Sequence, residues 1–160
     1  MSPLPDDVVV RLKGVSRIYK NGDNQVAALS DIDLDIRRGE FVALVGPSGS
    51  GKTTLLNMIG GLDRPTSGHI WIGDTDITGL SQAALAQVRL ERIGFVFQEY
   101  NLIPVLSALE NVAFSLKMKG VAREERLARA RELLDRVSMG HLAQRKPDEL
   151  SGGQQQRVAI

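Results

Sequence analysis

A glycine-rich segment at residues 46–54, GPSGSGKTT, has the residue types and spacing that bind a phosphate group. It fits the pattern G-x-x-x-x-G-K-[ST], with Gly46, Gly51, Lys52 and Thr53 at the fixed positions. Glycines let the backbone curl around a phosphate without Cβ clashes, and a following helix N-terminus favours negative charge. In such loops the lysine reaches the β- and γ-phosphates, and the threonine hydroxyl can bind Mg²⁺. The pattern predicts a nucleotide site made by Gly46, Pro47, Ser48, Gly49, Ser50, Gly51, Lys52, Thr53 and Thr54.

A second segment that could bind phosphate is LSGGQQQRVAI, at residues 150–160. Ser151 and Gln154 have the S-x-x-Q spacing of a capping box at a helix start. Gly152 and Gly153 would leave the first amides of that helix open to an anion, which the helix N-terminus favours. A capped helix without a ligand would explain the serine and the glutamine. It would not explain the paired glycines, each of which is disfavoured in a helix by about 1 kcal/mol relative to alanine.

Strands must lie before and between these segments to position them. Short strands are predicted from apolar runs or alternation at 8–12, 31–36, 41–45, 69–73 and 92–98. The run FVALV at 41–45 is apolar throughout, which is typical of a strand covered on both faces. A helix is predicted after the phosphate loop and ends at Gly60 and Gly61.

The pattern becomes helical after Gln98. A helix is predicted at 107–120, because Ser107 and Glu110 have capping-box spacing. Another is predicted at 123–137, with one apolar face formed by Leu127, Ala130, Leu133, Leu134 and Val137. Its arginines alternate with acidic residues, which indicates a solvated face rather than a nucleic-acid surface. The order predicts an α/β core at 1–97 and a helical part at 98–160.

The composition excludes several classes of protein. The 160 residues carry a net charge of +1, which gives no indication of a nucleic-acid partner, and the absence of cysteine excludes disulfides and thiolate metal sites. No apolar run approaches the roughly 20 residues that cross a bilayer, and the N-terminus lacks the pattern of a signal peptide. We therefore expect a cytoplasmic protein. Asp74 and Asp76 lie in a Gly/Asp/Thr turn, and turn chemistry accounts for them better than a metal role.

Together, GPSGSGKTT, FVFQEYNLIPVLSALENV and LSGGQQQRVAI, in this order, resemble the ATP-binding subunits of ABC transporters. The resemblance runs from GVSRIYKNGDNQVAALSDIDLDIRRGE onward. Within the family, DRPTSGHIWIGDTDITGLS followed by FQEYNLIPVLSALENV is most similar to ATPases of the lipoprotein-release and macrolide-export type. The resemblance implies a P-loop NTPase core of the ABC type with an inserted α-helical subdomain. It also implies that ATP hydrolysis powers a membrane permease, which would hold the subunit on the inner face of the membrane.

The resemblance also implies roles for single residues. Tyr19 matches the aromatic residue that stacks on adenine, although an ordinary edge-strand tyrosine is the alternative. Gln98 matches the glutamine that senses Mg²⁺ and the attacking water, so Lys52 and Gln98 are expected to act in catalysis and Thr53 and Gln98 at the metal. The signature Ser151, Gly152, Gly153 and Gln154 would cover ATP held by a second subunit in a head-to-tail dimer. The surface between Gln98 and Leu109 would dock the permease.

Two family elements are not found among the 160 residues: an apolar strand ending in Asp-Glu, and a later histidine. In this class an aspartate at a strand end binds Mg²⁺, and the resemblance implies that a glutamate after it acts as general base. We expect both elements to follow Ile160, so that the chain is the N-terminal part of a longer domain, incomplete at its C-terminus. We also expect residues 1–160 alone not to turn over ATP. The alternatives are an ABC-type ATPase of DNA maintenance or translation, and a non-hydrolysing nucleotide-binding module.

Overall fold

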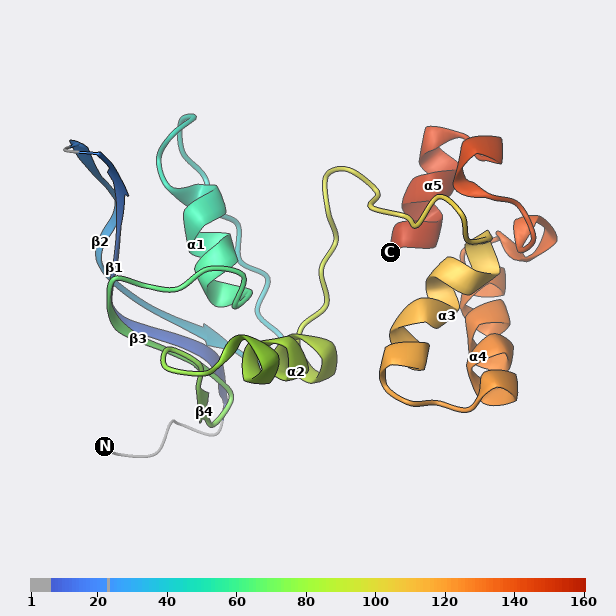
Figure 1. Ribbon diagram of the computed structural model, residues 1–160, viewed down its shortest axis with the longest axis horizontal. Coiled ribbons are helices and arrows are strands. Elements are labelled where there is room, and N and C mark those ends of the chain that lie inside the picture. Colours follow the sequence, from blue (N-terminus) through green and yellow to red (C-terminus); the bar gives the residue numbers. More distant parts are fainter. Residues whose placement is uncertain (1–6, 23) are drawn as a thin grey trace. The chain divides into compact units, whose positions relative to one another are not determined.

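The computed structural model describes residues 7–22 and 24–160. The chain divides into two compact units, Met1–Arg92 and Ile93–Ile160 (Figure 1). The described part of the first unit contains an antiparallel sheet in the order β2-β1-β3-β4. The strands are β1 (Val8–Asn21), β2 (Asn24–Arg37), β3 (Ser67–Ile72) and β4 (Thr75–Asp76), and the helices of this unit are α1 (Lys52–Ile59) and α2 (Gln82–Arg92).

Apolar residues of adjacent strands form the core of the sheet. Leu12 of β1 lies opposite Leu34 of β2 and Ile70 of β3, and it is almost fully buried. In β2, Ile32, Leu34 and Ile36 are half-buried, whereas the aspartates between them are exposed. The predicted alternation at 31–36 is therefore confirmed. The predicted strand at 8–12 is also confirmed, but it continues to residue 21 because β2 folds back along its whole length.

Helix α1 lies against β2 and β3 and connects the phosphate loop to the sheet. It begins after Gly51, which has a φ of 87°, and its Met58 is fully buried. Gly60 forms the C-cap, and Gly61 follows with a φ of 60°. The predicted helix and its glycine stop are confirmed.

The strands predicted at 41–45 and 92–98 are wrong. Neither segment forms a strand, and Phe41 and Val45 are 98% and 93% exposed. In the second segment Val96 is 65% exposed, and the rings of Phe95 and Phe97 stack 5.7 Å apart. A strand exists only where its backbone pairs with a neighbour, and no described strand pairs with either segment. Apolar composition alone does not supply that partner.

The second unit is helical and has its own apolar core. It contains α3 (Ala108–Met118), α4 (Arg123–Arg136) and α5 (Gly152–Ala159), with 3₁₀ turns at η1 (Gly140–Leu142) and η2 (Pro147–Glu149). Helix α3 packs against α4 and α5, around Leu109, Ala130, Leu134 and Met139. The helices predicted at 107–120 and 123–137 are confirmed. Leu133, which was assigned to the apolar face of α4, is 44% exposed instead.

None of the helices formed by the described residues is long and apolar enough to cross a membrane.

Candidate functional site

The phosphate loop is arranged around the side-chain amine of Lys52. Its Nζ donates hydrogen bonds to the carbonyl oxygens of Gly46 at 2.8 Å and Pro47 at 2.7 Å, and it lies 3.3 Å from Ser50 Oγ. These bonds hold the ammonium group across the loop that it follows in sequence. A positive charge is thereby fixed beside backbone groups that can curl around a phosphate.

Glycines of this loop are required by close contacts as well as by conformation. A Cβ on Gly51 would lie 2.5 Å from the carbonyl oxygen of Ala28 in β2, and one on Gly46 would lie 2.8 Å from Ser50 Oγ. Gly49 and Gly51 both have positive φ angles, which side-chain-bearing residues rarely adopt. Glycine is therefore required at position 51 by the Ala28 backbone and at positions 49 and 51 by their φ angles, whereas the Ser50 side chain could turn away from a Cβ at position 46.

The N-terminus of α1 is suited to an anion. No side chain caps it, and its first turn contains no acidic residue. Helix N-termini leave backbone N–H groups without intrahelical partners, and these groups attract negative charge. Thr53 is exposed in this first turn and Thr54 is half-buried beside it, while Ser48 lies exposed in the loop. The predicted phosphate-binding residues 46–54 thus form one contiguous surface at the helix start.

Tyr19 lies near the end of β1, and its ring is held from two directions. Its hydroxyl donates a hydrogen bond to Asp63 Oδ2 at 2.8 Å. The guanidinium carbon of Arg17 lies 4.5 Å from the ring centroid, within the range of a cation–π contact. The side chain remains 39% exposed, so part of the ring is open to a ligand.

The signature segment begins α5 in the helical unit. Ser151 Oγ accepts a hydrogen bond from the Gln154 amide, and Gln154 Oε1 accepts one from the Ser151 amide at 2.8 Å. The predicted capping box is confirmed. A Cβ on Gly152 would lie 2.8 Å from the Tyr100 hydroxyl, whereas one on Gly153 would meet nothing within 4 Å. The contact with Tyr100 therefore favours glycine at position 152, whereas no contact accounts for glycine at position 153.

Gln98 is exposed in the non-helical segment that leads to α3. The same segment carries Val105, which is 75% exposed. Its end is fixed by Asn111 of α3, whose amide oxygen accepts a hydrogen bond from the Ile103 amide at 2.7 Å. The Asn111 amide nitrogen donates to the carbonyl oxygens of Ile103, Leu106 and Ser107 at 3.0–3.2 Å. One side chain thus shapes the loop that carries Val105.

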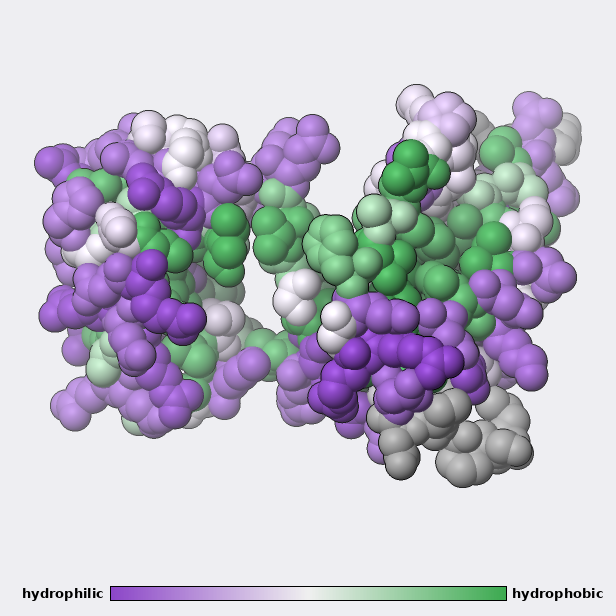
Figure 2. Space-filling view, turned by 180° about the vertical axis from the view of Figure 1, so that it is seen from behind, coloured by the Kyte–Doolittle hydropathy of each residue, from purple (hydrophilic) through white to green (hydrophobic). Residues whose placement is uncertain are grey.

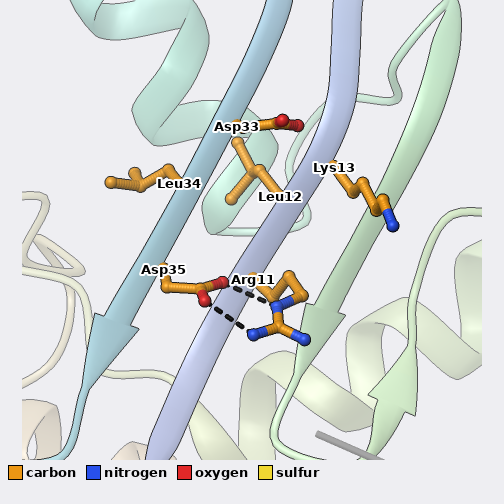
Figure 3. Close-up of a pocket in the computed structure, with 6 residues that line it drawn as sticks. All are labelled: Arg11, Leu12, Lys13, Asp33, Leu34 and Asp35. Atoms are coloured by element: carbon orange, nitrogen blue, oxygen red, sulfur yellow. Dashed lines mark hydrogen bonds and ion pairs between the residues drawn. The ribbon is translucent and has the colours of Figure 1, made fainter. Parts of the chain in front are cut away.

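A separate shallow hollow of about 340 Å³ lies over β1 and β2 (Figure 3). Arg11 spans it with two hydrogen bonds to Asp35, at 2.7 and 2.6 Å. The bond from Arg11 holds the pKa of Asp35 below its ordinary value of 3.8. None of the residues that line the hollow is a predicted site residue. Because Arg11 and Asp35 pair with each other, neither charge is left for a ligand. We therefore interpret the hollow as a depression in the surface of the sheet rather than as a binding site.

The carboxylates of the GDTDIT turn bond partly within the turn and partly to side chains elsewhere in the unit. Asp74 accepts bonds from Thr75 Oγ1 at 3.2 Å and from Arg92 at 2.9 Å. Asp76 accepts one from the Thr78 amide at 2.9 Å and lies 3.0 Å from His69 Nδ1. Within residues 7–22 and 24–160, no group of three or more His, Cys, Asp or Glu side chains could hold a metal ion.

Three structural residues of these sites were missed by the sequence analysis: Asp63, Tyr100 and Asn111. Asp63 lies 44 positions from Tyr19, and Tyr100 lies 52 positions from Gly152, so no local spacing connects them. Asn111 follows Ser107 by four residues within a recognised helix start, and this proximity could have drawn attention to it.

The family model described as ABC transporter matches residues 29–160. The lipoprotein-releasing system ATP-binding protein LolD of Chromohalobacter salexigens is 48% identical over 97% of this chain and 65% of its own length. The macrolide export ATP-binding/permease protein MacB of Salmonella paratyphi A is 49% identical over 95% of this chain and 24% of its own. The chain thus spans about two thirds of the first relative and a quarter of the second.

Solved structures show the same likeness. The dimeric structure of the ATP-binding cassette MJ0796 in a post-hydrolysis state, bound to ADP and Pi, is 48% identical to this chain. It superimposes with a TM-score of 0.85 over 94% of this chain and 66% of that one. A second dimeric structure of the cassette gives a TM-score of 0.86. The predicted fold class is confirmed by this similarity, and the match over residues 29–160 shows that the chain belongs to the ABC transporter family.

Proposed function

We propose that the protein is the ATP-binding subunit of an ABC transporter and hydrolyses MgATP to drive a membrane permease. The observation that carries this proposal is the phosphate loop, where Lys52 is held across the loop at the uncapped start of α1. The names of the relatives, which describe ATP-binding proteins of lipoprotein release and macrolide export, support transport rather than DNA maintenance or translation.

In this proposal each part of the loop has a separate role. The backbone N–H groups of residues 48–54 would surround the β- and γ-phosphates, and Lys52 would turn from its loop carbonyls to a γ-phosphate oxygen. The Thr53 hydroxyl, exposed in the first turn of α1, is suited to bind Mg²⁺, as is the exposed amide of Gln98. Bound Mg²⁺ would neutralise charge that develops on the phosphates during transfer. Gln98 orients the attacking water, and Tyr19 stacks on adenine.

The signature acts on a nucleotide held by another copy. Ser151 and Gln154 cap the start of α5, which leaves the amides of Gly152 and Gly153 for an incoming γ-phosphate, and Gly153 has open space where a side chain would lie. Two cassettes arranged head to tail would each complete the other's site. The solved cassette structures similar to this chain are dimeric, which supports the pairing of two copies. Residues 1–97 then form the nucleotide core, and residues 98–160 contain Gln98, the helical subdomain and the signature.

The permease is proposed to dock on the surface between Gln98 and Leu109. This stretch contains the exposed Val105 on a loop that Asn111 holds in place. A rigid loop with an apolar tip can bind a partner without a large entropic cost for ordering itself.

The test of the proposed function is ATP hydrolysis by the full-length protein assembled with its permease. Lys52→Ala removes the amine that stabilises the transferred phosphoryl group, so we expect it to abolish hydrolysis. Phosphate release equal to that of the unaltered assembly would contradict the proposal. Asp74→Ala is the matched control, because Asp74 is an exposed carboxylate of the same unit outside the loop.

A polypeptide of residues 1–160 alone is expected to bind nucleotide without appreciable turnover. No apolar strand within these residues ends in the Asp-Glu pair that the mechanism requires. Phosphate release by this polypeptide at the rate of the full-length assembly would contradict this expectation.

A further inference from the structure

Asp63 connects three groups around the proposed adenine-binding residue. It lies in the turn after α1, and its Oδ2 accepts the hydrogen bond from the Tyr19 hydroxyl at 2.8 Å. Its Oδ1 accepts bonds from Arg17 Nη2 at 2.9 Å and from the backbone amide of Arg64 at 2.7 Å. The side chains of Arg17 and Asp63 are only 23% and 27% exposed, so this ion pair is partly shielded from water. Shielded, charge-assisted bonds are stronger than exposed ones.

Arg17 also restricts how a flat ligand can approach Tyr19. Its guanidinium lies over one face of the ring, 4.5 Å from the centroid, and the bond to Asp63 keeps it there. A purine can therefore stack only on the other face of the ring. The side chain of Tyr19 is partly exposed, which leaves room for such stacking.

The backbone around these residues is fixed by the same turn. The Ile18 amide donates a hydrogen bond to Thr66 Oγ1 at 3.0 Å, and the Thr66 amide donates to the Ser16 carbonyl at 2.8 Å. Residues 63–66 follow α1 closely, and the Leu62 amide bonds to the carbonyl of Asn57 within that helix. Helix α1, whose N-terminus is proposed to bind the phosphates, thus also supports the ring proposed to hold the base, through the turn after its C-terminus.

We propose that Asp63 is a positioning residue for nucleotide binding: it fixes Tyr19 and Arg17 as a platform that accepts a purine ring on one defined face. This inference rests on the proposed stacking role of Tyr19 and adds the group that holds the ring in place. A preorganised ring binds its ligand more tightly because no side-chain freedom is lost at the moment of binding.

The test compares two ligands, ATP and inorganic tripolyphosphate, by calorimetric titration of the full-length protein with Mg²⁺ present. Tripolyphosphate lacks the base, so its affinity reports the phosphate loop alone. We expect Asp63→Ala to weaken ATP binding about five- to tenfold, the order of effect of one typical hydrogen bond. Tripolyphosphate affinity should stay unchanged. Tyr19→Ala should weaken ATP binding about ten- to a hundredfold, which is the range measured for stacking of one base.

Two further variants keep the test decisive if Asp63→Ala does not fold. Tyr19→Phe retains the ring and removes only the hydroxyl that bonds to Asp63, so it should weaken ATP binding several-fold while tripolyphosphate binding is unaffected. Asp63→Asn keeps an acceptor for the hydroxyl but removes the charge that pairs with Arg17, so its ATP affinity should lie between those of the unaltered protein and Asp63→Ala. Asp74→Ala, which removes an arginine-paired carboxylate elsewhere in the unit, is the matched control and should change neither affinity.

The outcomes separate the positioning role from the stacking role. The quantity compared is the affinity for ATP divided by the affinity for tripolyphosphate. If Tyr19→Ala leaves this ratio unchanged, Tyr19 does not stack on the base and the platform has no function. If Tyr19→Ala lowers the ratio but Tyr19→Phe and Asp63→Ala do not, stacking stands and the positioning role of Asp63 is overturned. An equal loss of both affinities in Asp63→Ala would also overturn it, because Asp63 would then act on the fold of the whole site.

Discussion

Two adjacent glycines of the signature are subject to different constraints. Gly152 lies so close to Tyr100 that a Cβ would come within 2.8 Å of its hydroxyl oxygen, whereas Gly153 is open on that side. Helix interiors disfavour glycine, so a glycine that no contact requires is retained for another reason. The proposed contact with a γ-phosphate supplies that reason for Gly153 alone.

Gly153→Ala should separate stability from activity. We expect the free energy of unfolding to stay constant or to rise by up to about 1 kcal/mol, because alanine is the better helix former. ATP hydrolysis by the assembled transporter should fall at least about tenfold, since a methyl group would stand between the amides and the phosphate. Urea denaturation and phosphate release measure the two quantities. Unchanged hydrolysis would show that nothing approaches Gly153 closely.

Gly152→Ala should behave differently, because its methyl group meets Tyr100 rather than a ligand. We expect a lower midpoint of thermal unfolding. Adding Tyr100→Phe removes the oxygen atom in question and should restore most of that midpoint. A midpoint that is equally low with and without the tyrosine oxygen would mean that another contact limits this position. The sequence alone could not distinguish the two glycines, since Tyr100 lies far from them along the chain.

At the scale of elements, the start of α3 shows what local sequence can predict. Ser107 and Glu110 form the predicted capping box, with the Ser107 amide donating to Glu110 Oε2 at 2.9 Å and the Glu110 amide donating to Ser107 Oγ at 3.2 Å. The backbone hydrogen bond from Ser107 is the main reason why the pKa of Glu110 lies below its ordinary value of 4.5. All the partners lie within one helical turn, so spacing alone was sufficient.

Acid should weaken this helix start. A carboxylate whose pKa is lower in the folded state contributes stability above its unfolded pKa and loses it as the pH falls through the folded value. We therefore expect the stability due to Glu110 to be complete at neutral pH and to be lost below about pH 4. Glu110→Gln keeps an acceptor for the Ser107 amide but does not titrate. The free energy of unfolding of this variant should therefore fall less than that of the unaltered protein between neutral pH and about pH 4. Equal acid sensitivity of the two proteins, measured by urea denaturation at each pH, would contradict this assignment.

The loop before α3 depends on one side chain. Asn111 bonds to three backbone residues of that loop, and its substitution by alanine would leave their partly buried carbonyl and amide groups without these partners. We expect Asn111→Ala to lower the free energy of unfolding by about 1–3 kcal/mol, the usual cost of such unpaired groups. Faster hydrogen exchange at the Ile103 amide would locate the change. Ser115→Ala is the matched control, because Ser115 is an exposed polar residue of α3 outside the bonds to this loop.

At the scale of the whole molecule, the elements that sequence predicted wrongly share one property. Residues 41–45 and 92–98 are as apolar as buried strands, yet they form no strand within the described residues. Helix α1 and the capping boxes of α3 and α5 need partners only a few residues away, and each was predicted correctly. A strand needs a neighbour that can come from anywhere in the chain, so composition indicates its burial but not its pairing. The hydrogen bond of Tyr19 to Asp63 was missed for the same reason.

The exposed apolar residues at 41–45 should bind hydrophobic dyes, which can be measured. Phe41 and Val45 of the N-terminal unit are 98% and 93% exposed. Figure 2 shows apolar side chains on one face of this unit. Exposed apolar patches bind hydrophobic dyes and promote self-association. We expect a polypeptide of residues 1–160 to enhance the fluorescence of an anilinonaphthalene sulfonate dye and to elute earlier from gel filtration as its concentration rises.

Replacing both exposed residues should reverse this behaviour. The double variant Phe41→Ser, Val45→Ser removes the two most exposed large apolar side chains of the segment, so dye fluorescence and the shift in elution should both decrease. Val26→Ser is the matched control: Val26 is 61% exposed on β2, in a strand that is already paired with β1, and its loss should change neither measurement. If the control lowers dye binding as much as the double variant does, the dye reports general surface character. The segment at 41–45 would then not be the source of the association, and its apolar run would need another explanation than a missing partner.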